Sequence, residues 1–108
     1  MTEVVIVNEQ IGADLRRIWA SLDAEGNLVI SGQDIGPKVK RFFGTDEYEF
    51  AHTVPAAHIK SFFALLGVEI FEDPLKTVEK FGGSQYNKLA DALELAKESM
   101  PIKFWSRH

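Results

Sequence analysis

Alternation on both sides of a polar turn is the feature that most constrains the fold of this chain. Residues 15–22 alternate between two faces. One face holds Arg16, Ile18, Ala20 and Leu22, and the other holds Leu15, Arg17, Trp19 and Ser21. The turn that follows contains Gly26 and Asn27, residue types that tolerate positive φ, and residues 28–30 then resume a β-rich run. The pattern predicts a β-hairpin that turns at residues 23–27.

The segment 46–54 alternates in the same way and predicts a further strand. One face holds Tyr48, Phe50, His52 and Val54, and the other holds Glu47, Glu49, Ala51 and Thr53. Because apolar and aromatic residues gather on the first face, we expect that face to contact the core.

Helical spacing dominates the second half of the chain. Pro55 suits a first helical turn and Gly67 suits a C-cap, which together predict a helix over residues 55–66. A second helix is predicted from Asp73–Pro74 to Gly82–Gly83, because an acidic cap precedes proline at the first position. A third is predicted from Ser84 to about Lys97.

Three segments have weaker patterns. Residues 32–37 contain Gly32, Gly36 and Pro37 and predict a connecting loop, while residues 38–43 are weakly helical and are left unassigned. Residues 102–107 are too apolar to remain fully solvated, so we expect them either to return to the sheet as a strand or to lie across the helices. Trp105 is expected to anchor that segment by burial.

This order, with strands first and helices later, predicts an α+β fold. We expect an antiparallel sheet formed mainly by the N-terminal half, packed against two or three helices from the C-terminal half. Residues 1–108 are expected to form one domain, since the length suits a single core. The chain has no cysteine, which excludes thiolate chemistry and cysteine-based zinc sites.

Charge and hydropathy narrow the classes of partner. Residues 1–54 hold five Lys and Arg against nine Asp and Glu, whereas residues 55–108 hold seven of each. An acidic half disfavours nucleic acid, which needs a basic surface, and favours a protein partner with a basic or neutral surface. The apolar run at residues 4–7 is too short for a signal peptide or a membrane span, so we expect a cytoplasmic protein that does not enter a membrane.

Two candidate metal or catalytic sites are weak. The turn residues Asp23, Glu25 and Asn27 match the first alternate ligands of a calcium loop, but the sixth position is Leu28 instead of glycine. His52 and His58 could share a metal or act as acid and base, yet a hydrogen-bonded core histidine is the more common state of a residue like His52. The sequence therefore predicts no catalytic residue, metal or cofactor.

The candidate binding residues are acidic or aromatic. Asp46, Glu47 and Glu49 form an acidic stretch that we interpret as a recognition edge, because nothing nearby predicts a raised carboxyl pKa. Asp34 lies in the glycine-rich segment, which lacks the Lys-Ser/Thr pair of a phosphate-binding loop. Trp19 becomes a binding candidate if its indole is exposed.

Four segments of the chain resemble a family of small uncharacterised bacterial proteins. They are residues 18–23 followed by Gly26, residues 28–37 with the GQD-x-GP loop, residues 47–50 with the EYE strand, and the terminal Phe104-Trp105-Ser106. The resemblance implies a single domain and brings no known activity, cofactor or catalytic residue.

The leading hypothesis is a non-enzymatic protein-binding module, with an immunity-like role as one form of it. The alternative is a small hydrolase or ligand-binding enzyme that uses His52 or His58 with nearby carboxylates. A homodimer formed through an unpaired strand edge is a third possibility.

Overall fold

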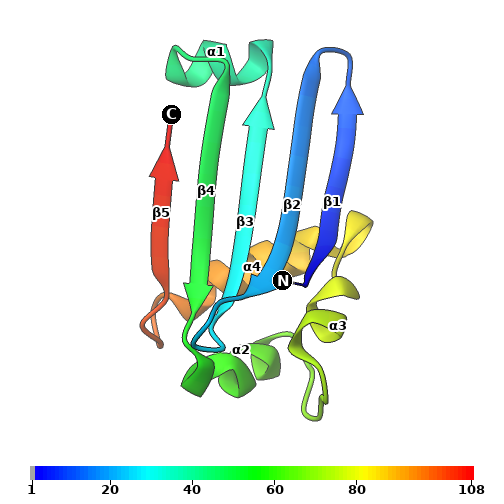
Figure 1. The fold of residues 1–108 in the computed structure, drawn as a ribbon, viewed down its shortest axis with the longest axis vertical. Helices are drawn as coiled ribbons and strands as arrows, with labels where there is room; N and C mark the ends of the chain where they lie inside the picture. Colours follow the sequence, from blue (N-terminus) through cyan, green and yellow to red (C-terminus); the bar gives the residue numbers. More distant parts are fainter. Residues whose placement is uncertain (1) are drawn as a thin grey trace.

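Five antiparallel strands form one sheet, and strands that follow each other in the chain are neighbours in space (Figure 1). The computed structural model describes residues 2–108. The strands are β1 (Glu3–Ile11), β2 (Asp14–Leu22), β3 (Leu28–Ile35), β4 (Glu47–Val54) and β5 (Lys103–Arg107). The first four strands come from the N-terminal half, and the predicted α+β class is confirmed.

The hairpin between β2 and β3 turns where the alternation predicts. Leu22 pairs with Leu28, and Gly26 adopts a φ of 80°, which glycine reaches at low cost. Asp23 holds the turn together: its Oδ1 accepts hydrogen bonds from the backbone N–H groups of Glu25 and Asn27, each at 2.9 Å. A hydrogen bond from the Asn27 side chain, together with these two backbone bonds, lowers the pKa of Asp23. The carboxylate is thus committed to the turn, as a structural role requires.

Four α-helices complete the fold: α1 (Pro37–Phe43), α2 (Ile59–Leu65), α3 (Pro74–Glu79) and α4 (Tyr86–Ala96). The last three follow β4 and lie on one side of the sheet, toward one end of the strands, whereas α1 crosses the opposite end (Figure 1). The predicted first and third helices begin as short 3-10 turns at Ala56–His58 and Gly83–Gln85. The segment left unassigned between residues 38 and 43 belongs to α1.

The core fills the space between the sheet and the last three helices. Phe62 and Phe63 of α2 are fully buried, and Phe63 meets Phe71 edge to face with ring centroids 4.7 Å apart. The sheet contributes its inward alternate positions, and α4 contributes Leu89 and Leu93. Each fully buried side chain of this size stabilises the fold by roughly 1.5–3 kcal/mol.

Strand β1 was not predicted, and its pattern explains why. A β-bulge between Val5 and Val7 shifts the register, so that Ile6 and Val7 are both buried next to Ile18 of β2. A bulge places two residues opposite one and so interrupts strict alternation. The run of four apolar residues therefore shows no period of two.

Strand β3 is longer than predicted. The connecting loop predicted from residue 32 is wrong, because pairing with β2 and β4 continues to Ile35 and only Gly36 makes the turn. Gly32 pairs with Phe50, whose ring occupies the space that a side chain at position 32 would need. Glycine at this position thus reflects close packing within a strand.

The C-terminal segment returns to the sheet as β5, which pairs with β4 from Lys103 to Arg107. The alternative placement across the helices is thereby excluded. The expectation that Trp105 is a buried anchor is wrong, since 51 % of its surface is exposed. Backbone pairing, rather than indole burial, holds this segment in place.

Candidate functional site

The predicted binding residues lie on two opposite faces of the sheet. Strand pairing places Trp19, Glu47 and Glu49 on the face away from the helices, and it places Asp34 on the face toward them. Asp46 is exposed in the turn before β4. The structure therefore does not bring the five residues together into one site.

The first candidate surface is the uncovered face of the sheet. Among residues 2–108, no side chain that points to this face from the five strands is fully buried, and the ribbons of the sheet are bare on this side (Figure 1). One row across the strands runs Val5, Trp19, Ser31, Ala51 and Trp105. Two indoles thus flank a floor of two small residues, and three interstrand spacings of about 4.8 Å separate their strands.

Arginines accompany both tryptophans. The guanidinium carbons of Arg17 and Arg107 lie 5.9 Å from the ring centroids of Trp19 and Trp105, respectively, within the range of cation–π attraction. Arg107 also donates a hydrogen bond to Glu49 at 3.0 Å. Each indole is therefore held beside a cation while part of its surface faces solvent.

The prediction that the acidic stretch forms a recognition edge is wrong, because the strand order of the sheet does not place β4 at an edge. β4 lies between β3 and β5, so it is an interior strand, and the edges of the sheet are β1 and β5. Glu49 is paired with Arg107, and Glu47 accepts a hydrogen bond from the Gln33 amide at 2.8 Å. These carboxylates belong to a face of mixed charge and form no acidic edge.

The second candidate surface is a cavity of about 640 Å³ between α1 and the helix-facing side of the sheet. Four neighbouring strands contribute one row to its floor: Glu9, Arg16, Asp34 and Tyr48. Arg16 donates from Nε to Asp34 Oδ1 at 2.9 Å, and its NH2 group donates to Oδ2 at 3.4 Å. This hydrogen bonding to Asp34 raises the pKa of Arg16.

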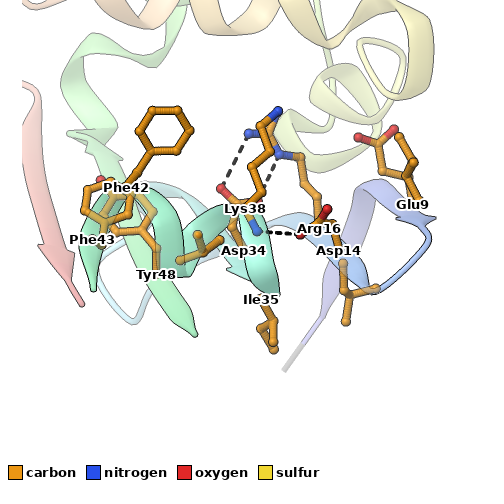
Figure 2. A pocket seen from close by; sticks show the side chains of 12 residues that line it. Glu9, Asp14, Arg16, Asp34, Ile35, Lys38, Phe42, Phe43 and Tyr48 are labelled. Atoms are coloured by element: carbon orange, nitrogen blue, oxygen red, sulfur yellow. Dashed lines mark hydrogen bonds and ion pairs between the residues drawn. The ribbon is translucent and has the colours of Figure 1, made fainter. Parts of the chain in front are cut away.

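Helix α1 forms the wall of the cavity. Phe43 stacks on Tyr48 with ring centroids 4.6 Å apart, and Phe42 is 76 % exposed. Figure 2 shows these aromatic side chains on one side of the Arg16–Asp34 pair and Glu9 on the other. The cavity therefore has an aromatic end and a charged end.

Sequence reasoning missed most of this cavity. Glu9 lies on the strand that was not predicted, and Arg16 was noted only as a member of a face. One signal was available: Arg16 shares its face with the apolar residues Ile18 and Ala20, and this pattern places a charged residue on the core side of the sheet. A cation on that side needs a partner or a solvent-filled cavity, and here it has both.

His52 is buried on the helix-facing side, as predicted, but it is not hydrogen-bonded. Its surface is 8 % exposed, and neither ring nitrogen has a hydrogen-bond partner within residues 2–108. Burial, aided by the charge of Lys97, lowers the pKa of His52 to about 4. His52 is therefore neutral near pH 7.

The residues of the enzyme alternative do not converge. Glu47 and Glu49 point to the uncovered face, whereas His52 points to the opposite one. His58 lies half-buried beyond the end of β4, in the turn that precedes α2. In the part of the chain that the structure describes, no three His, Asp or Glu side chains are grouped so that they could hold a metal ion.

Comparison with known proteins adds no relative. No family model, curated protein or solved structure matches the chain. Within residues 2–108, no helix combines the length and the apolar character that a membrane crossing requires.

Proposed function

We propose that this protein is a non-enzymatic interaction module whose uncovered sheet face binds a protein partner. One observation carries the proposal: Trp19 and Trp105 stand on either side of a floor formed by Ser31 and Ala51. Tryptophan and arginine are the residue types that most often dominate binding energy at protein interfaces. This face presents both types together.

The charge of the face indicates the kind of partner. Arg17, Lys103 and Arg107 provide three cations, and Glu3, Glu47 and Glu49 provide three carboxylates. One of these carboxylates already pairs with Arg107. A face of mixed sign suits a partner whose surface is close to neutral, with an apolar side chain that fits between the indoles.

An immunity-like role is one form of this proposal. Such a protein needs a rigid surface that covers part of its target and needs no chemistry of its own. A sheet supported from behind by three helices provides that rigidity, because the strand positions are fixed by backbone hydrogen bonds.

The test compares variants of the two faces in affinity capture from the cells that contain the protein. Trp19→Ala and Trp105→Ala are expected to weaken capture of the partner by about tenfold each, a typical effect for an aromatic hot spot. Phe42→Ala is the matched control, because it removes an exposed aromatic ring from the opposite face.

Salt dependence provides a second readout. Capture through the indoles is expected to survive 0.5 M salt, which screens exposed charge pairs but leaves apolar burial intact. A partner that is lost at this salt concentration, or that is retained by both tryptophan variants, would contradict the proposed face. Light scattering of the free chain distinguishes a partner protein from a second copy of this chain.

A further inference from the structure

The cavity beside α1 is separate from the proposed protein-binding face. Its floor residues, Arg16 and Asp34, point to the helix-facing side of the sheet, whereas Trp19 points to the other side. A volume of about 640 Å³ falls within the range that small-molecule sites occupy. A protein partner on the uncovered face would leave this cavity accessible.

Hydrogen-bonding capacity in the middle of the cavity is uneven. The carboxylate of Asp34 already accepts two hydrogen bonds from Arg16, and only 18 % of its side chain is exposed. Asp14 is also engaged, because its Oδ1 accepts from the backbone N–H of Lys38 at 3.0 Å. Both carboxylates in the middle of the cavity therefore already accept hydrogen bonds from the protein itself.

The donors, in contrast, are free. Asp34 occupies one edge of the Arg16 guanidinium, the arginine side chain is 48 % exposed, and its remaining N–H groups have no partner in residues 2–108. Within the same residues, no carboxylate oxygen lies within 4.0 Å of the Lys38 ammonium. A ligand that offers a hydrogen-bond acceptor can therefore bind to the free N–H groups of Arg16 and Lys38.

The other end of the cavity is lined by aromatic side chains and favours a ligand with a planar ring. Phe42 and Phe43 of α1 are both exposed, and Phe43 is held flat against Tyr48. Exposed phenyl rings at the mouth of a cavity gain by covering their faces with another planar group. Figure 2 shows that these rings lie beside the Arg16–Asp34 pair, so one small molecule can reach both ends.

We propose that this cavity binds a small aromatic monocarboxylate. Its carboxylate accepts hydrogen bonds from Arg16 and Lys38, and its ring lies against Phe42 and Phe43. Lys38 supplies a cation that has no ion-pair partner within residues 2–108, whereas Arg16 is already paired with Asp34. Glu9 stands at the far end of the row and disfavours a second carboxylate.

The test is an NMR titration of the full chain with three probes that share one ring. Indole-3-acetate is expected to shift the backbone amide signals of residues 34–48. Tryptamine carries an ammonium group in place of the carboxylate, and 3-methylindole carries no charged group. Both are expected to bind at least about tenfold more weakly than indole-3-acetate. Equal binding of the three probes, tighter binding of tryptamine, or no shift at 10 mM indole-3-acetate would overturn the proposal.

Two charge reversals on the same helix locate the site. Lys38→Glu is expected to weaken indole-3-acetate binding by about tenfold. Lys40→Glu is the matched control, because Lys40 is also exposed on α1 but does not line the cavity. Phe42→Ala is expected to weaken binding as well, and because Phe42 is 76 % exposed its removal leaves the fold intact. If Lys40→Glu weakens binding as much as Lys38→Glu, the cavity is not the site.

Discussion

Acid sensitivity at His52 tests the packing of this protein most directly. The imidazole contacts the rings of Phe50 on the same strand and of Phe104 on β5, with centroid distances of 6.0 and 4.8 Å. The charged groups that influence it lie at the C-terminal end of α4: Lys97, the residue after the helix, lowers the pKa of His52, and Glu94 raises it by a smaller amount. Desolvation exceeds both effects and brings the pKa to about 4.

The direction of the pH effect follows from this lowered pKa. In the unfolded chain His52 has an ordinary pKa of about 6.5, so the unfolded state binds the proton more tightly than the folded state. Stability is therefore complete above about pH 6.5 and falls as the pH decreases toward 4. If the whole difference between these two pKa values acts on stability, the free energy of unfolding decreases by about 2 kcal/mol between pH 7 and pH 5. We expect about 1–2 kcal/mol, because solvent still screens the outer side of the ring.

Urea denaturation at pH 7, 6 and 5 measures this loss in the wild type and in His52→Leu. The variant cannot take up the proton, so its free energy of unfolding is expected to change by less than about 0.5 kcal/mol over the same range. At pH 7 the variant is expected to be at least as stable as the wild type, because it removes two buried nitrogens that lack partners. His58→Gln is the matched control for loss of a histidine that is only half-buried.

A lower limit of pH 5 separates the protonation of His52 from the protonation of carboxylates. Carboxylates whose pKa is lowered by hydrogen bonds, such as that of Asp23, take up protons only at lower pH. If His52→Leu loses as much stability as the wild type between pH 7 and pH 5, the reasoning from burial is refuted. An NMR titration that finds a pKa above 6 for His52 would refute it independently.

Two substitutions test the packing of the sheet and the core. Gly32→Ala is expected to cost about 1–3 kcal/mol, because the Phe50 ring must move to admit the new methyl group, whereas Ser31→Ala on the uncovered face is expected to be within about 0.5 kcal/mol of the wild type. Phe63→Ala removes a fully buried ring and is expected to cost about 3–5 kcal/mol, with the exposed Phe42→Ala as its control. Urea denaturation measures both costs, and an unchanged midpoint for Gly32→Ala or Phe63→Ala would contradict the packing described.

Elements set by neighbours in the sequence were predictable. The two faces of β2 and of β4 follow from strict alternation, and strand pairing confirms them. The start of α3 follows from Asp73, whose Oδ1 accepts hydrogen bonds from the backbone N–H groups of Leu75 and Lys76 at 2.9 and 3.3 Å. In each case the interaction that decides the structure spans only a few residues.

Elements that depend on distant partners were not predictable. Ile6 and Val7 both point inward because a bulge in β1 meets β2 in that register. Gly32 stands in the middle of a strand because the Phe50 ring needs its space. A glycine of this kind has the same local signature as one in a loop, and only its neighbour across the sheet distinguishes the two.

The candidate surfaces show the same division. Trp19 was predicted to bind a partner if it proved exposed; pairing with β3 places it, half-buried, on the uncovered face that also carries Trp105 from the far end of the chain. The ion pair of Arg16 with Asp34 joins residues eighteen positions apart. Neither composition nor spacing could show that Phe42 and Phe43 of α1 lie beside that pair.

By itself the sequence determined the alternation of β2 and β4, the last three helices and the hairpin held by Asp23. Those features depend on backbone geometry and on side chains within about five residues of each other. The tertiary structure alone decided that β4 is an interior strand, that Trp105 is exposed and that a cavity opens beside α1. These outcomes depend on which strands pair across the sheet, and pairing energy is gained from contacts that the linear order of residues does not display.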